Sequence, residues 1–180
     1  MTHFEQIELL ASDLHGYFTA SRARGLGILS CELDRWMKRG RLENPARGVY
    51  RLANYPSSEA EPYVLAVLSA GEGAFLFGES VLAMLNLVPA EAGPIRVGSS
   101  SRVRRKRSAR LQIVHVEAGC DVVNYEGLAV QPLAEAIRAA RGRVRHDRRM
   151  RAVEEGFRQG FLEISEYRSL RKELQREAAS

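Results

Sequence analysis

The sequence predicts an α+β protein with two domains, over residues 1–55 and 56–180. Its 180 residues are 45% hydrophobic and 27% charged, a composition typical of globular proteins. Segments with helical periodicity alternate with short apolar segments of strand length. The stretch from Asn54 to Glu59 combines a proline with small polar residues, which is typical of a linker. The chain is therefore expected to divide there.

Residues 1–55 contain predicted elements in a recognisable order. Thr2 and Glu5 form a capping box, and apolar residues at helical spacing follow. The chain is then expected to form an extended segment at 15–18, a helix at 20–24 ended by Gly25, and a tight turn at 26–29. A third helix at 31–39, capped by Ser30 and ended by Gly40, precedes a hairpin with strands at 41–43 and 49–52. This order predicts a winged helix-turn-helix, whose third helix enters the major groove of DNA.

The third helix has one apolar and one polar face. Its apolar face carries Leu29, Leu33, Trp36 and Met37, which are expected to pack against the first two helices. We expect Arg35 on the opposite face to contact base edges. Lys38, Arg39 and Arg47 are expected mainly to contact phosphates. The alternative is that these residues form an ordinary solvated face. The predicted DNA contacts are Ser21, Arg22, Arg24, Ser30, Arg35, Lys38, Arg39 and Arg47.

Residues 56–180 predict a mixed α/β domain with a small sheet and closing helices. Helices are expected to begin near Glu59, over 79–87, over 131–140, over 146–159, and from a cap at Ser165. Strands are expected at 94–97 and 111–116, with a hairpin at 122–130, giving three or four strands.

The net charge of +5 is concentrated in segments. Seven basic residues and no acid lie between Arg96 and Arg110, and seven arginines against one acid lie between Arg138 and Arg151. Each segment has three explanations: a solvated surface, a second nucleic-acid contact, or a docking site for an acidic or RNA-bound partner. The candidate second basic patch consists of Arg102, Arg104, Arg105, Lys106 and Arg107.

No catalytic, metal or cofactor site is predicted, and we expect no enzymatic activity. Gly98 and Ser99 follow a strand, as in nucleotidyltransferases, but no acid occurs from Ala92 to Val116 to hold Mg²⁺. The four histidines and two cysteines lack metal-ligand or catalytic spacing. No apolar segment reaches the roughly 18 to 20 residues of a membrane span, so a cytoplasmic protein without membrane contact is expected.

The N-terminal motifs resemble those of the AbiEi-type antitoxins. The residues that carry the resemblance are Gly16-Tyr17-Phe18-Thr19, Ala23, Gly25-Leu26-Gly27-Ile28, Leu33-Asp34-Arg35, Gly40-Arg41-Leu42 and Arg47-Gly48-Val49-Tyr50-Arg51-Leu52. Weaker similarity continues in Phe77-Gly78-Glu79-Ser80-Val81-Leu82 and in Gly127-Leu128-Ala129-Val130-Gln131-Pro132.

The resemblance implies the antitoxin of a bacterial type IV toxin–antitoxin system. Its winged helix would bind repeats in the double-stranded DNA of its own promoter and repress the operon. Its second domain would help to counteract a nucleotidyltransferase-like toxin encoded next to it, without a direct complex being implied. A homodimer on DNA is one arrangement left open. Two alternatives are a protein- or RNA-interaction module that uses the basic C-terminal patches, and a regulator that responds to a small molecule.

Overall fold

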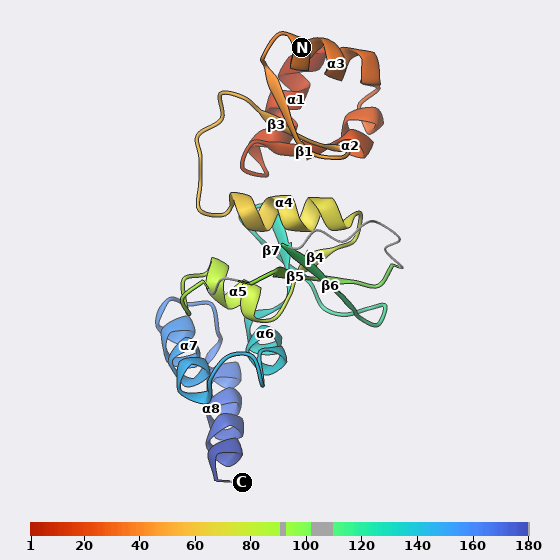
Figure 1. Cartoon of the computed structure of the whole chain (residues 1–180). Helices are drawn as coiled ribbons and strands as arrows, with labels where there is room; N and C mark the ends of the chain where they lie inside the picture. Colours follow the sequence, from red (N-terminus) through yellow and green to blue (C-terminus); the bar gives the residue numbers. More distant parts are fainter. Residues whose placement is uncertain (91–92, 102–109, 180) are drawn as a thin grey trace.

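The computed structural model describes residues 1–90, 93–101 and 110–179. Within these ranges the protein is mixed α/β, with eight helices and two small sheets. Figure 1 shows the N-terminal part at one end and the closing helices at the other. None of the described helices is long and apolar enough to cross a membrane.

The N-terminal part packs three helices on a three-stranded antiparallel sheet with strand order β1-β3-β2. A buried cluster that includes Phe4, Ile7, Phe18, Leu33 and Trp36 fills the space between them. The elements are α1 (His3–Ser12), β1 (Tyr17–Thr19), α2 (Ala20–Gly25), α3 (Ser30–Lys38), β2 (Leu42–Ala46) and β3 (Val49–Leu52).

Local hydrogen bonds explain where the first two helices begin. The capping box predicted for α1 is present, because Thr2 and Glu5 each accept a backbone hydrogen bond from the other. The Thr19 hydroxyl accepts the N–H of Arg22 and caps α2. Each side chain satisfies a donor that the first turn of a helix leaves without a partner.

Several predicted boundaries in this part are wrong, and three of them have a clear physical reason. Gly25 lies within α2, and the left-handed residue that ends this helix is Gly27, with φ of +80°. Ser30 is the first residue of α3, whose N-cap is Leu29. The turn predicted at 44–48 shortens to residues 47–48, because β2 continues to Ala46 through an irregularity in the pairing.

The second sheet has five described strands in the order β6-β5-β4-β8-β7, whereas three or four were predicted. The extra strand is β4, whose two residues lie in the middle of the sheet between an antiparallel and a parallel neighbour. A segment this short is not distinguishable from a buried turn by its periodicity. The strands are β4 (Phe75–Leu76), β5 (Ile95–Ser99), β6 (Leu111–His115), β7 (Val123–Tyr125) and β8 (Leu128–Val130).

Five helices accompany this sheet: α4 (Glu61–Ala70), α5 (Glu79–Met84), α6 (Leu133–Ala139), α7 (His146–Arg158) and α8 (Ile164–Ala178). Several predicted boundaries differ from the structure: α4 begins at Glu61 rather than near Glu59, and α6 covers Leu133–Ala139 rather than 131–140. Helix α5 ends at Met84 rather than near Leu87, and the N-cap of α8 is Glu163 rather than Ser165. The stop of α7 before Gly160, which has φ of +80°, is confirmed.

Helix α4 lies between the two sheets (Figure 1). Leu14, Tyr17 and Val49 of the N-terminal part belong to the same buried cluster as Val64 and Val67 of α4. The division into domains 1–55 and 56–180 stays a prediction. Side chains from both sides of that division share one core.

A buried ion pair reinforces this contact. Arg51 of β3 is 7% exposed, and its Nη2 donates to Glu61 Oε1 of α4 at 2.9 Å and to the Tyr55 carbonyl at 2.9 Å. The Tyr17 hydroxyl donates to Glu61 Oε2 at 3.3 Å, and the Ser58 N–H donates to Glu61 Oε1 at 3.1 Å. These bonds connect the first sheet to the first residue of α4.

Candidate nucleic-acid interface

The turn between α2 and α3 fixes the orientation of α3. The N–H of Ile28 donates to the Ala23 carbonyl and that of Gly27 to the Arg24 carbonyl, which closes α2 with a Schellman motif. Ile28 is buried, and Leu33 and Trp36 of α3 are buried beside it. Trp36 also packs edge-on against Phe4 of α1, with ring centroids 5.1 Å apart. These contacts confirm Trp36 as a core residue.

A second set of contacts ties the beginning of α3 to α1. His3 Nδ1 lies 2.9 Å from Glu32 Oε1, and Glu32 Oε2 accepts the N–H of Leu29 at 3.0 Å. The contact with His3 and the bond from Leu29 lower the pKa of Glu32 below its ordinary value. Glu32 is therefore a carboxylate that holds the first turn of α3 in place.

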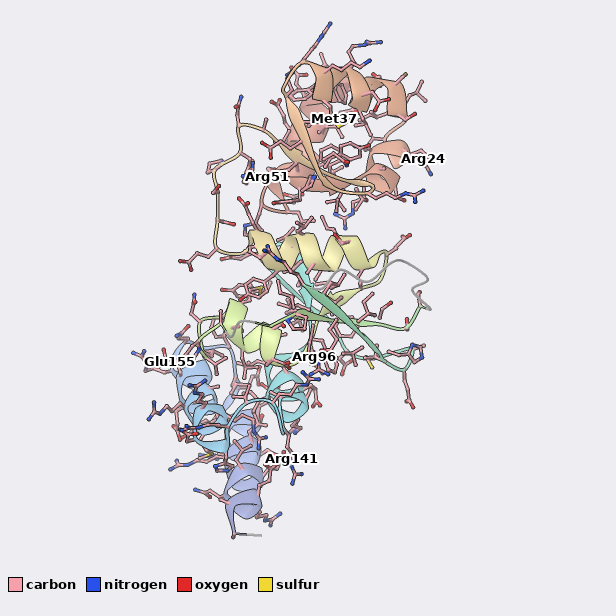
Figure 2. The ribbon with its side chains drawn as sticks, in the orientation of Figure 1. Arg24, Met37, Arg51, Arg96, Arg141 and Glu155 are labelled. Atoms are coloured by element: carbon pink, nitrogen blue, oxygen red, sulfur yellow. The ribbon has the colours of Figure 1, made fainter. Side chains whose placement is uncertain are left out.

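All eight residues predicted to contact DNA are exposed. They come from the start and end of α2, from α3 and its C-cap, and from the tip of the β2–β3 hairpin. Figure 2 shows Arg24 at the outer edge of the N-terminal part, on the side of α2. The structure brings Ser21, Arg22, Arg24 and Arg47 together along one groove and places Arg35, Lys38 and Arg39 on α3 or its C-cap. Their role in DNA contact stays a prediction.

One residue of the predicted apolar face is on the surface instead. Leu29 was expected to pack inside, but its side chain is 62% exposed. The prediction placed Leu29 on a helical wheel, whereas its backbone is extended, with φ of −85° and ψ of 153°. The helical position of its side chain therefore does not apply.

The cationic side chains of this surface make no ion pair or side-chain hydrogen bond within residues 1–90, 93–101 and 110–179. This is true of Arg22, Arg24, Lys38, Arg39 and Arg47. Arg35 likewise has no such bond there, although its charge contributes to the lowered pKa of Glu32. Unpaired guanidinium groups retain all their donors for phosphate or base acceptors.

The groove between the N-terminal part and the second sheet has a volume of about 640 Å³. One wall carries Arg22, Arg24 and Arg47, and the other includes the 71–74 turn after α4 and Leu128 of β8. Among the described lining residues, Glu72 is the single acid. The groove is therefore positively charged on the wall formed by α2 and the hairpin.

The arginines between 138 and 158 contrast with those of the groove, because most of them are paired. Arg138 is bonded to Glu135 and Glu173, and Arg149 is bonded to Glu177. These pairs favour the explanation that much of this basic segment is a structural or solvated surface. Further pairs join Arg141 to Glu177, Arg143 to Glu79, Arg145 to Asp147 and Arg158 to Glu155.

The candidate second basic patch, Arg102 to Arg107, lies outside the described residues. Its three explanations therefore stay open.

Gly98 and Ser99, the pair that the sequence has in common with nucleotidyltransferases, are both buried in the structure. Gly98 and Ser99 lie within β5, where a Cβ atom on Gly98 would meet the Phe75 ring at 2.7 Å and where Ser99 is buried. No group of three or more His, Cys, Asp or Glu residues among the described ones is arranged to hold a metal ion. Cys31 and Cys120 are both exposed free thiols.

Residues 5–53 match the family model described as transcriptional regulator, AbiEi antitoxin. This N-terminal segment is similar to the AbiEi antitoxin regulators. The match covers about a quarter of the chain and includes the motifs at 16–52, so the resemblance is confirmed there. No curated protein matches the sequence. The AbiEi-type segment contains all eight predicted contacts, and its family description indicates an antitoxin regulator.

The surface positions of three residues in this region, Leu26, Leu29 and Glu72, were not predicted from the sequence. Leu26 and Leu29 have the apolar character of core residues, yet both are exposed beside α3. Glu72 lies far along the sequence from the arginines with which it lines the groove. A Gly-Glu-Gly sequence after a helix indicates a turn but does not indicate what lies opposite it.

Proposed function

We propose that this chain is a DNA-binding repressor of its own operon and the antitoxin of a bacterial type IV toxin–antitoxin system. The match of residues 5–53 to the AbiEi antitoxin regulators carries this proposal. The exposed and unpaired cations of α2, α3 and the hairpin tip support it, because DNA binding depends strongly on such charges.

In this proposal residues 1–55 act as a winged helix-turn-helix. The order α1-β1-α2-α3-β2-β3 and the sheet order β1-β3-β2 support that assignment. Helix α3 enters the major groove, Arg35 contacts a base edge, and Arg22, Arg24 and Arg47 contact phosphates. Lys38 and Arg39 contribute further phosphate contacts from the C-terminal half of α3.

A salt titration tests the DNA-binding role. Binding of the full chain to the DNA upstream of its own gene is compared with binding to a scrambled duplex of equal length. We expect binding to the upstream DNA to persist at about 0.2 M salt, where backbone contacts alone are weak. Equal and equally salt-sensitive binding to both duplexes would contradict the proposal.

A pair of variants separates this role from that of an interaction module using the C-terminal basic patch. The first replaces Arg35, Lys38 and Arg39 by alanine, and the second replaces the five basic residues between Arg102 and Arg107. We expect the first variant to lose specific DNA binding and the second to retain it. Loss of nucleic-acid binding in the second variant alone would favour the interaction module.

The antitoxin role has a separate test. The chain is co-expressed with the nucleotidyltransferase-like toxin proposed to be encoded next to it, and bacterial growth is measured. We propose that the chain acts without catalysis in the cytoplasm and restores growth, and co-purification tests whether it binds the toxin directly. Absence of rescue would remove the antitoxin role and leave the repressor role standing.

A further inference from the structure

Two large apolar side chains lie on the surface at the turn before α3. Leu26 is 41% exposed and Leu29 is 62% exposed. Neither is among the side chains packed on the N-terminal core, whereas Ile28 between them is 2% exposed. The turn therefore directs one apolar residue inward and two outward.

The backbone of the turn holds Leu29 in this position. Gly27 adopts a φ of +80°, which L-residues with side chains rarely adopt, and this conformation allows Ile28 to reach the core. Leu29 then follows in an extended conformation, with its N–H bonded to the Glu32 carboxylate. Its exposure thus follows from a fixed local geometry.

Leu29 lies at the start of α3, the helix that is proposed to enter the major groove, and its N–H is bonded to the Glu32 carboxylate. Ser30 follows it at the first position of α3, and the exposed Arg35 lies on the same helix. A surface that is complementary to DNA meets few apolar groups there. In the major groove, the C5-methyl group of thymine is the apolar group that each A·T pair presents.

We propose that Leu29, with Leu26 beside it, contacts the C5-methyl group of a thymine in the operator. This contact gives the protein a preference for an A·T pair at the position next to the N-terminus of α3. The inference rests on the proposed DNA-binding function and specifies part of the base sequence that the function requires.

The test replaces the operator thymines one at a time by 2′-deoxyuridine, which removes only the methyl group. Binding of the full chain to each duplex is measured by fluorescence anisotropy. Burying one methyl group contributes about 0.8 kcal/mol to binding. Replacing thymine by deoxyuridine at one or two positions of the operator should therefore weaken binding about fourfold at each of them. The same titrations are made with Leu29→Ala, Leu26→Ala and Leu9→Ala.

Leu9→Ala is the matched control, since Leu9 of α1 is also 62% exposed. We expect it to behave as the unchanged chain. Leu29→Ala should bind the thymine operator about fourfold more weakly and lose its sensitivity to deoxyuridine at the affected position. Thermal unfolding confirms that each variant folds.

Two results would overturn the inference alone. One is specific operator binding by the unchanged chain with no loss at any deoxyuridine position. The other is a Leu29→Ala variant that keeps the full sensitivity to deoxyuridine. A chain that does not distinguish the operator from scrambled DNA would instead overturn the proposed function, and this inference with it.

Discussion

An arginine on a protein surface is fully available to a phosphate only where no carboxylate already holds it. Arg141 is 71% exposed in its side chain, yet its Nη1 lies 3.8 Å from Glu177 Oε1. Arg24 is also exposed, but it has no such partner within the described ranges. Both guanidinium groups are visible at the surface in Figure 2. Their different partners, rather than their exposure, distinguish them as candidates for DNA contact.

Arg35 is expected to provide sequence preference, whereas Lys38 provides affinity. We predict that Arg35→Ala weakens operator binding roughly tenfold to a hundredfold, because a bidentate contact to guanine is lost, and weakens binding to scrambled DNA less. Lys38→Ala should weaken both about equally and reduce the salt slope by about one. Anisotropy titrations at several salt concentrations measure both quantities. Equal losses on operator and scrambled DNA for Arg35→Ala would contradict its role as a base contact.

Glu72 is expected to limit the affinity for DNA. It lines the same groove as Arg22, Arg24 and Arg47, so its negative charge is expected to repel a phosphate bound there. We predict that Glu72→Gln strengthens binding to the operator and to scrambled DNA by about twofold to fivefold at low salt, an effect that shrinks as salt rises. Glu8→Gln, at an exposed position on α1, is the control and should change neither affinity. Unchanged binding by Glu72→Gln would mean that the groove lies away from the DNA.

At the scale of elements, local signals could be predicted from the sequence and contacts between distant segments could not. The capping box at Thr2 and the position of Gly40 after α3 follow from residue types a few positions apart. The exposure of Leu29 depends on whether the helix begins before or after it, and a shift of one residue reverses the expectation. The pairing of β4 in the middle of the second sheet depends on strands more than 20 residues away.

The tip of the β7–β8 hairpin packs closely against the end of α1. A Cβ atom on Gly127 would lie 1.7 Å from the Asp13 carbonyl oxygen, and Gly127 also has φ of +86°. We predict that Gly127→Ala destabilises the protein by at least about 2 kcal/mol, since the clash adds to the backbone strain. Gly142→Ala tests the strain alone, because Gly142 has φ of +77° but no atom within 4 Å of its Cβ position. Urea unfolding should show a clearly smaller loss for Gly142→Ala, and equal losses would contradict the contact.

The contact between Arg51 and Glu61 makes the attachment of α4 dependent on pH. Burial raises the pKa of Glu61, but hydrogen bonds from Arg51 and the Ser58 N–H outweigh this effect and bring the pKa below its ordinary value of 4.5. A carboxylate with a lowered pKa in the folded state stabilises the protein above its unfolded pKa. That stabilisation is lost as the pH falls through the folded pKa.

We therefore predict that Glu61→Gln costs about 2 kcal/mol of unfolding free energy at pH 7, since a charged hydrogen bond to a buried guanidinium is weakened. The difference between the unchanged chain and the variant should shrink as the pH is lowered below about 4.5. Urea unfolding across this range measures the difference. A difference that is independent of pH would mean that the charge of Glu61 contributes nothing to the attachment.

At the scale of the whole molecule, the net charge of +5 does not indicate where DNA binds. The sequence places seven arginines between 138 and 151, and their number alone would favour this segment as a nucleic-acid contact. The structure shows that acids from α5, α6 and α8 hold many of them. Apart from Glu135, which is three residues from Arg138, these acids lie 28 to 64 residues from their partners in the sequence, so charge patterning could not have revealed those pairs.

Two triple variants with the same net charge separate local contacts from the overall field. The first replaces Arg22, Arg24 and Arg47 of the groove by alanine. The second replaces Arg141, Arg145 and Arg158, whose side chains are at least 71% exposed but lie within 4.0 Å of an acid. Both variants remove three positive charges, so any general effect of net charge on DNA binding is the same in both.

If the groove arginines contact phosphates, the slope of log K against log salt should fall by about 2.7 in the first variant, at about 0.9 for each lost contact. The second variant should keep the slope of the unchanged chain, because arginines already held by carboxylates release few counterions from DNA. Equal reductions in both variants would show that the positive charge acts only as a diffuse field. A salt slope reduced only in the second variant would indicate that DNA contacts the C-terminal helices. The paired arginines there would then have to exchange their carboxylate partners for phosphates.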